Sequence, residues 1–257
     1  MSMWKECEGL QEELVKMRRE LHQIPEFGLD LPETQKYVTD KLDELGIPYK
    51  CSGTDSSIIA EIKGGQPGKT VALRADMDAL KITEANDVDY KSKHEGLMHA
   101  CGHDNHMTGL LGAAMLLCER REEIAGTVKL IFQPAEEMSP VGGSRGMLHS
   151  GYMDDVEAVF GLHVWPDLPH GKIGVKAGPL MAATDHFTIN IHGKTAHGAK
   201  PNQGIDAVVL GSQFVMAAQT IVSRKVDPLD NAVVTFGIFN AGTRYNIIAG
   251  DCTLDGT

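Results

Sequence analysis

The sequence predicts an α/β fold followed by a smaller α+β domain. Up to about residue 183, helical segments alternate with short apolar strands, a pattern typical of a domain built on a mostly parallel sheet. Beyond that point the strands alternate polar and apolar residues, as strands do when one face of their sheet is open to solvent. We therefore expect two domains, spanning residues 1–183 and 184–257.

The larger domain is predicted to begin with two amphipathic helices. Between Leu10 and Leu21, leucines and a methionine recur three and four residues apart with charged residues between them, which is helical spacing. A second helix is expected to begin at Pro32, since proline is favoured at the first helical position, and to end before Gly46. Both helices have an apolar face that can pack on a sheet.

Short apolar strands and one buried helix are expected to follow. The runs 57–62 and 70–75 have the composition of strands, and the glycines in the segment 63–65 between them favour a turn. The segment 110–118 is small and apolar nearly all round, as expected of a buried helix. Two further apolar strands are predicted at 126–133 and 156–164.

The smaller domain is predicted from a β-α-β run. Residues 187–192 alternate like a half-exposed strand, residues 205–222 are helical, and residues 232–239 form a second strand. A third strand is expected near 251–254. No internal repeat or low-complexity tract is present, which excludes a solenoid.

Composition and charge exclude several classes of partner. The 257 residues are 42% hydrophobic and carry a net charge of −11, so neither nucleic acid nor an anionic membrane is expected as a partner. The chain has no apolar run long enough to span a bilayer, and its first residues do not resemble a signal peptide. The five cysteines are odd in number and scattered, which favours reduced thiols in a cytoplasm.

The first candidate metal-binding cluster lies just before the predicted buried helix. Cys101 and His103 are two residues apart, so a thiolate and an imidazole can reach one ion. Gly102 between them has no Cβ to crowd that approach. By itself, this cluster is also compatible with a structural zinc loop or a chance grouping.

Two further clusters supply the remaining ligands. Glu136 and Glu137 follow the predicted strand 126–133, at the carboxyl edge where α/β enzymes place their sites, although such pairs are also common on acidic surfaces. His163 lies within an otherwise apolar strand, where a histidine is more often a core residue than a ligand. Taken together, cysteine, histidine, glutamate and histidine form a mixed set suited to Zn²⁺, Mn²⁺, Co²⁺ or Ni²⁺.

Three motifs in order give the chain a recognisable resemblance. Residues 73–80 read LRADMDAL, residues 98–104 read MHACGHD and residues 133–137 read QPAEE. They resemble the signatures of the M20 peptidase family, and best its amidohydrolase branch, which includes hippurate hydrolase, auxin-conjugate hydrolases and bacterial N-acyl-amino-acid deacylases. The segment 18–26, RRELHQIPE, is similar to the usual opening of that branch.

The resemblance implies a fold and a ligand set. It implies a zinc-exopeptidase-like catalytic domain in residues 1–183 and a ferredoxin-like lid and dimerisation domain in residues 184–257. Two divalent ions would be held by four side chains, with the thiolate bridging both ions. These are Cys101, His103, Glu137 and His163.

The resemblance also implies a reaction and the residues for it. A metal-activated water would hydrolyse the amide bond of an N-acyl amino acid or short peptide, with Glu136 as general base. Asp78, or with less support Asp76, would orient a ligand. His197 would reach across a homodimer from the lid to the oxyanion, and Asn246 would help hold the substrate.

Some features depart from this family pattern. Lys81 and Ala249 stand where proline is usual, and Asn105 stands where glycine is usual. The family's return segment, with a last histidine ligand, would follow Thr257, so we expect the sequence to be part of a longer protein.

Two other functions compete with metal-dependent hydrolysis. In one, Cys101 is the nucleophile of a cysteine hydrolase, although that chemistry has no need for the glutamate pair. In the other, the chain is a non-catalytic metal-binding or interaction module that has kept the fold.

Overall fold

The computed structural model describes residues 3–138 and 142–257, which form two compact units. Unit 1 comprises Met1–Ile173 and unit 2 comprises Gly174–Thr257. The division therefore lies earlier in the chain than the predicted boundary between residues 183 and 184. None of the helices in the described residues combines the length and the apolar character that a membrane span requires.

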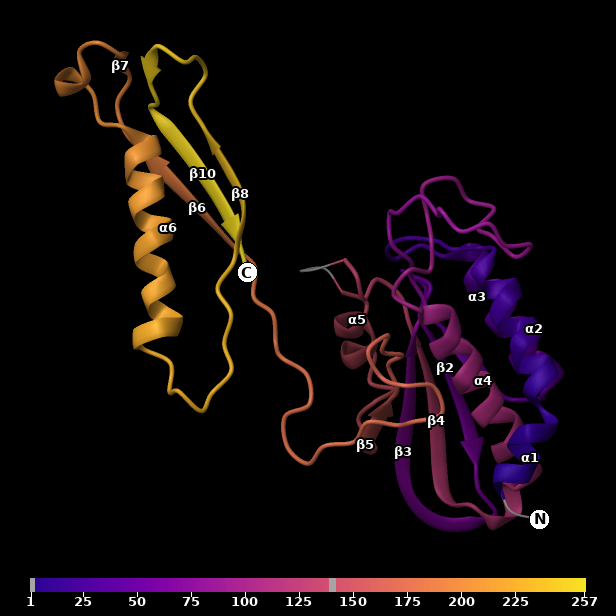
Figure 1. The fold of residues 1–257 in the computed structure, drawn as a ribbon. Helices are drawn as coiled ribbons and strands as arrows, with labels where there is room; N and C mark the ends of the chain where they lie inside the picture. The colour runs from indigo at the N-terminus through magenta and orange to yellow at the C-terminus, as the bar shows by residue number, and fades with distance from the viewer. Residues whose placement is uncertain (1–2, 139–141) are drawn as a thin grey trace. The chain divides into compact units, whose positions relative to one another are not determined.

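A five-stranded mixed sheet forms the centre of unit 1 (Figure 1). Its order is β1-β2-β4-β3-β5, in which β3 runs parallel to β4 and β5, whereas β2 runs antiparallel to β1 and β4. The strands are β1 (Tyr49–Cys51), β2 (Ile58–Lys63), β3 (Gln66–Asp76), β4 (Ala125–Gln133) and β5 (Val156–Gly161). The expectation of an α/β fold is confirmed, but the expectation of a mostly parallel sheet is wrong.

The mixed character comes from the position of β4. Although β2 and β3 are consecutive in sequence, β4 lies between them in the sheet. The link between them passes the start of β4 closely, since the Gly64 amide donates to the Gly126 carbonyl at 2.8 Å. A Cβ on Gly64 would lie 2.1 Å from the carbonyl oxygen of Ile124, so only glycine fits there. The glycines that predicted a turn therefore allow this close passage.

Helices cover both faces of the sheet in unit 1. The main core contains Leu21 of α2 (Gln11–His22), Leu42 of α3 (Pro32–Glu44) and Leu111 of α4 (His103–Glu119), packed with Phe132 of β4. On the other face, Met147 of α5 (Ser144–His149) packs with Ala72 and Ile131. The alternation of Ile131 and Phe132 between these faces is the period of a strand. The short helix α1 (Met3–Gly9) precedes α2, and a 3₁₀ turn, Arg121–Glu123, precedes β4.

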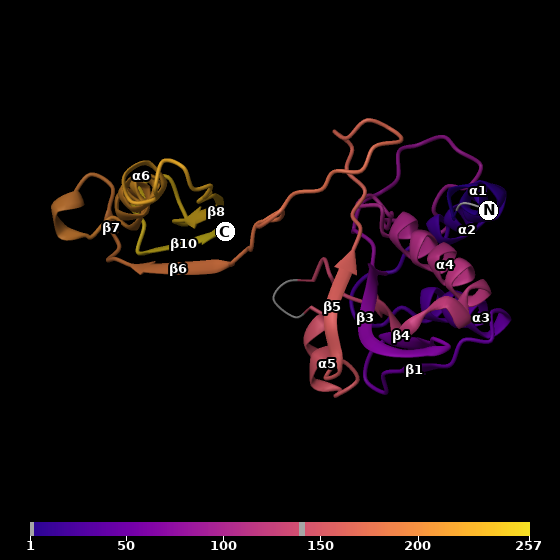
Figure 2. The same ribbon diagram turned by 90° about the horizontal axis from the view of Figure 1, so that it is seen from below.

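Unit 2 is a three-stranded antiparallel sheet with one helix on it. The order is β6-β10-β8, with β6 at Phe187–His192, β8 at Phe236–Ala241 and β10 at Asp251–Gly256. Helix α6 (Ala207–Arg224) packs on one face, and Figure 2 shows it nearly end-on beside the strands. Two short strands, β7 (Ala196–His197) and β9 (Ile247–Ile248), pair separately, and a 3₁₀ turn spans Pro201–Gln203. The predicted α+β organisation agrees with this arrangement.

Candidate metal centre

The loop before α4 makes a sharp turn at Gly102. Its φ is 95°, in the left-handed region that glycine adopts at little energetic cost, and α4 begins at the next residue. A Cβ at this position would lie 2.4 Å from Cγ2 of Val164. The glycine therefore lets the segment after β5 approach the loop that holds Cys101 and His103.

The turn after β4 is held by Asp78. Its carboxylate is fully buried and accepts the backbone N–H of Glu136 at 2.9 Å and that of Glu137 at 3.0 Å. Ala135, just before them, has a φ of 53°, a conformation that costs a non-glycine residue about 1–2 kcal/mol. Two hydrogen bonds to a charged acceptor are enough to offset that strain. Asp78 thereby fixes where the two glutamate side chains begin.

His103 presents a bare ring nitrogen to the glutamates. Its Nδ1 donates to the backbone carbonyl of Asp78 at 2.7 Å, which leaves Nε2 without a proton in the neutral ring. That Nε2 is buried and has no hydrogen-bond partner among the described residues. It lies 3.9 Å from Glu136 Oε2 and 3.8 Å from Glu137 Oε1. These separations are too long for hydrogen bonds and lie a few tenths of an ångström above the spacing of about 3.3–3.6 Å between nitrogen and oxygen ligands around one tetrahedral ion.

His163 lies outside the strand in which it was predicted. Strand β5 ends at Gly161, and the side chain of His163 is exposed in the segment that follows. Its Nδ1 donates to the carbonyl of Val164 at 2.6 Å, and its Nε2 lies 3.4 Å from Cys101 Sγ. The strand prediction is therefore wrong for this residue, although the structure places it beside the predicted thiolate.

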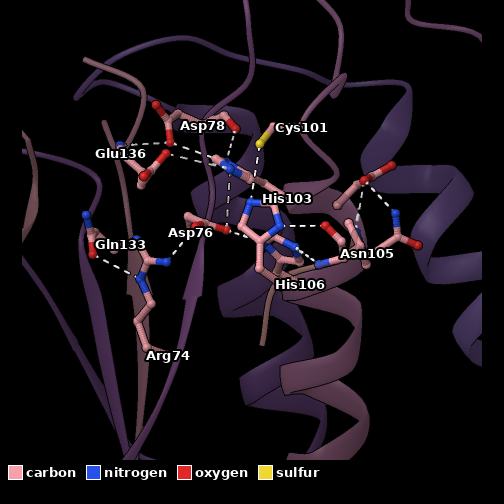
Figure 3. Close-up of polar contacts among 12 residues, drawn as sticks. Arg74, Asp76, Asp78, Cys101, His103, Asn105, His106, Gln133 and Glu136 are labelled. Carbon is pink, nitrogen blue, oxygen red and sulfur yellow. Dashed lines mark hydrogen bonds and ion pairs between the residues drawn. The ribbon is translucent and has the colours of Figure 1, made fainter. Parts of the chain in front are cut away.

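The four predicted ligands fall in two groups of side chains that share His103. Cys101, His103 and His163 form one group whose ligand atoms lie within 4.8 Å of one another, and His103, Glu136 and Glu137 form another. In Figure 3 the thiol of Cys101, the ring of His103 and the carboxylate of Glu136 converge on one region. Sulfur, imidazole and carboxylate donors in two groups that share a histidine are suited to two transition-metal ions.

The electrostatics of this cluster favour a cation. Burial, a hydrogen bond with Glu137 and the negative charges of Glu136 and Asp76 together raise the pKa of the Cys101 thiol to about 12. Burial and the neighbouring Glu137 also raise the pKa of Glu136. A divalent cation would reverse these effects, because it stabilises a thiolate and carboxylates at once.

A third group, Asp76 with His103 and His106, also has the composition of a metal site. However, Asp76 Oδ1 lies 2.5 Å from His106 Nδ1, which is a hydrogen-bond distance and too short for two ligands of one ion. Burial would raise the pKa of Asp76, but the hydrogen bond from His106 and the nearby Arg74 hold it below its usual range. Sequence reasoning gave His106 no role, although it lies two residues after the motif that contains Cys101 and His103.

A buried ionic cluster holds the first turn of α4 through Asp104. His22 Nδ1 lies 2.7 Å from Asp104 Oδ2, and its Nε2 lies 3.2 Å from Glu84 Oε1. Arg18 Nε is 3.0 Å from the same Asp104 oxygen. Arg18 and His22 belong to the opening motif of the chain, so this motif ties α2 to the helix that carries His103.

His197 and Asn246 lie side by side in unit 2. His197 pairs with Ile247 across β7 and β9, and the Gly198 amide donates to the carbonyl of Asn246 at 2.9 Å. His197 is exposed, and its Nδ1 accepts the N–H of Ala199 at 3.1 Å, so the proton of the neutral ring is on Nε2. The Oδ1 atom of Asn246 is buried without a hydrogen-bond partner among the described residues.

Comparison with known proteins extends over nearly the whole chain. The profile of Peptidase family M20/M25/M40 matches residues 72–253. An N-acetyl-L-cysteine deacetylase from Bacillus subtilis strain 168 is 44% identical over 248 residues, which cover 96% of this chain and 59% of the relative. An N-acyl-L-amino acid amidohydrolase from Geobacillus stearothermophilus is 44% identical over 245 residues, covering 95% and 66%.

The chain is also similar to a solved structure of the same family. A dinuclear metal-binding M20 peptidase from Bacillus subtilis is 42% identical, with a TM-score of 0.78, and the match covers 97% of this chain and 64% of that one. The chain thus spans less than two thirds of the length of each of these proteins.

Proposed function

Since the chain belongs to peptidase family M20/M25/M40, we propose that it hydrolyses the amide bond of N-acyl amino acids or short peptides with the help of two divalent metal ions. One observation carries the proposal. The buried Nε2 of His103 has no hydrogen-bond partner among the described residues, and it faces two glutamates at 3.8–3.9 Å. A buried polar atom without a partner is unfavourable unless a ligand completes it, and in the neutral ring this nitrogen has no proton, as a metal ligand must.

We assign the ligands from the tautomers and distances. His103 and His163 each donate from Nδ1 to a backbone carbonyl, so in the neutral ring each has an unprotonated Nε2 that can bind an ion. Cys101 Sγ lies 3.4 Å from His163 Nε2 and interacts with Glu137, so its thiolate would be a ligand beside both of these side chains. Glu137 completes the set. Zn²⁺, Mn²⁺, Co²⁺ and Ni²⁺ all accept this mixture of donors.

Glu136 is placed to move protons. When bound, the ions would acidify a water molecule and polarise the substrate carbonyl. Glu136 is the more exposed of the two glutamates, with 43% of its side chain accessible, so it can reach a water molecule and a substrate. A carboxylate that reaches both the water molecule and the substrate suits a group that takes a proton from the attacking water and returns it to the departing amine.

Two residues of unit 2 would bind the substrate. His197 has its ring proton on Nε2 in the neutral ring, so across a homodimer it can donate a hydrogen bond to the developing oxyanion of the partner subunit's site. Such a donor contributes about 3 kcal/mol to transition-state stabilisation. Asn246 lies next to it and would hold the substrate through its side-chain amide. We also propose that unit 2 forms a homodimer, for which the exposed apolar residues Val209 and Met216, seven residues apart on one face of α6, provide a surface.

A cysteine hydrolase fits this site less well. A cysteine nucleophile needs a lowered thiol pKa, whereas burial and carboxylates raise the pKa of Cys101.

We also propose that the protein is located in a reducing cytoplasm. All five cysteines are free, which is compatible with this location.

The test is turnover as a function of metal. Protein stripped by a chelator and reloaded with Zn²⁺, Mn²⁺, Co²⁺ or Ni²⁺ is assayed against N-acetyl and N-benzoyl amino acids, with metal content measured on the same samples. We expect activity to vanish on stripping and to return with at least one metal. Activity that persists without metal would favour the cysteine mechanism. Full metal content with no turnover of any substrate would favour a non-catalytic metal-binding module.

A further inference from the structure

We propose that His106 is a positioning residue that fixes His163 through the main chain of Val164, and so sets the affinity of the ion that His163 binds. The inference rests on the proposed function only in requiring that the site binds metal. It concerns metal affinity rather than turnover.

The two ring nitrogens of His106 have different partners. Its side chain is 1% exposed and lies in the first turn of α4. The Nε2 atom accepts the backbone N–H of Val164 at 2.9 Å, and Nδ1 lies 2.5 Å from Asp76 Oδ1. An acceptor at Nε2 requires the proton of the neutral ring to be on Nδ1, where it is donated to the carboxylate. The ring therefore links a fixed carboxylate to one backbone amide.

The carboxylate at the far end is held by the sheet. Arg74 Nη1 lies 2.5 Å from Asp76 Oδ2, and Arg74 Nε donates to Gln133 Oε1 at 3.0 Å. Figure 3 shows this chain from Gln133 and Arg74 through Asp76 to His106. These partners come from the parallel pair β3 and β4, where Asp76 is opposite Gln133. Strand residues in the centre of a sheet are rigid supports for a site.

His163 needs such support because its own segment offers little. It lies beyond the end of β5 with an exposed side chain. Among the described residues its side-chain hydrogen-bond contacts are with Cys101 and with the carbonyl of its neighbour Val164, and its ring also packs against that of Trp165. His106 binds the N–H of that same neighbour, and the two histidine rings pack edge-to-face with centroids 4.6 Å apart. The position of the Val164 backbone thus determines both the place and the tautomer of His163.

Two substitutions at His106 separate the two hydrogen bonds. In His106→Gln, the amide oxygen reaches the former place of Nε2 and still accepts from Val164. In His106→Asn, the amide nitrogen takes the place of Nδ1 and still donates to Asp76, but nothing reaches Val164. We expect His106→Asn to lower the affinity for one of the two ions about 10- to 100-fold, which is the usual effect of losing a hydrogen bond to a metal-binding residue. His106→Gln should keep most of the affinity.

Metal affinity is measured by chelator competition on the full chain loaded with Co²⁺, whose visible spectrum reports the ligands. His163→Ala identifies the spectral change that belongs to the ion lost. Equal loss in both His106 variants, or no loss in either, would overturn the proposal, because a path through Val164 predicts that they differ. Thermal unfolding of the metal-free variants shows whether each one folds.

A measurement on the unsubstituted protein covers the case in which His106→Asn does not fold. Nitrogen NMR of labelled histidine, assigned with His106→Gln, should show His106 protonated on Nδ1 both before and after metal loading. A proton on Nε2, or an Nε2 signal shifted by metal, would overturn the proposal. Failure of the proposed function would be seen separately, as metal binding that depends on His106 but supports no turnover.

Discussion

Replacing Asp78 with asparagine removes the support beneath the glutamate turn. The carboxylate accepts two N–H groups, from Glu136 at 2.9 Å and from Glu137 at 3.0 Å. In Asp78→Asn one oxygen remains, and the new NH₂ group points at the second N–H, donor against donor. The substitution changes little in volume, so the loss is one of hydrogen bonding and of the carboxylate charge, which lies 3.5 Å from Nδ1 of His103.

The magnitude follows from those two bonds. Loss of one hydrogen bond to a buried charged acceptor costs about 1.5–3 kcal/mol, and the remaining bond weakens because its acceptor is neutral. The total destabilisation is therefore about 2–4 kcal/mol. Ala135 adds to the effect, because its left-handed backbone would no longer be held by the two bonds.

Urea unfolding followed by tryptophan fluorescence measures this loss on the metal-free protein. Both tryptophans, Trp4 and Trp165, are in unit 1, so their signal reports the unit that contains Asp78. Asp87→Asn makes the same chemical change at an exposed position and is the matched control. A loss below about 1 kcal/mol, or one no larger than that of the control, would show that Asp78 does not support the turn.

Three further predictions concern the site and its surroundings. Cys101→Ser should lower the metal content, since a serine hydroxyl is rarely ionised; equal occupancy by elemental analysis in this variant, the wild type and a Cys51→Ser control would contradict this. Gly102→Ala should destabilise unit 1 by at least about 1–2 kcal/mol in urea unfolding, because φ is 95° and a Cβ there would be 2.4 Å from a valine methyl; an unchanged midpoint would refute the close packing. The pKa of His22 is raised above 6.5, mainly by its hydrogen bond with Asp104 and against the opposing effect of burial. The contribution of the protonated ring to the free energy of unfolding is therefore full below pH 6.5 and is lost as pH rises through the raised pKa. His22→Gln should therefore lower the urea midpoint more at about pH 5.5 than at about pH 9, and the reverse order would show that the ring is neutral.

Much of the metal site could be predicted from the sequence because its residues lie at the ends of elements. Glu136 and Glu137 follow the end of β4, where the predicted strand 126–133 places them, and His103 lies ahead of the predicted helix 110–118, although α4 itself begins at His103. The strand order could not be predicted in the same way. The glycines between β2 and β3 favour a turn whether or not another strand lies between these two strands in the sheet. Only the long-range pairing of β4 with both of them determines the strand order.

The placement of His163 and the role of His106 could not be predicted from the sequence. The apolar run around His163 predicts a strand, but β5 ends at Gly161, and the residues after it are fixed by contacts from α4 instead. His106 binds a backbone amide 58 residues away, and no local pattern reveals such a partner. Its role depends on which ring nitrogen has the proton, and that is determined by tertiary contacts with Asp76 and Val164.

The division of labour within the glutamate pair is the central claim, and one paired measurement tests it most directly. Metal content and turnover of an N-acyl amino acid are measured together for Glu136→Gln and Glu137→Gln. We predict that Glu136→Gln keeps its metal and still binds substrate but loses at least about 10²-fold in turnover, as expected when a general base is removed. We predict that Glu137→Gln loses metal. Two variants that behave alike, or a Glu136→Gln protein with undiminished turnover, would contradict the account.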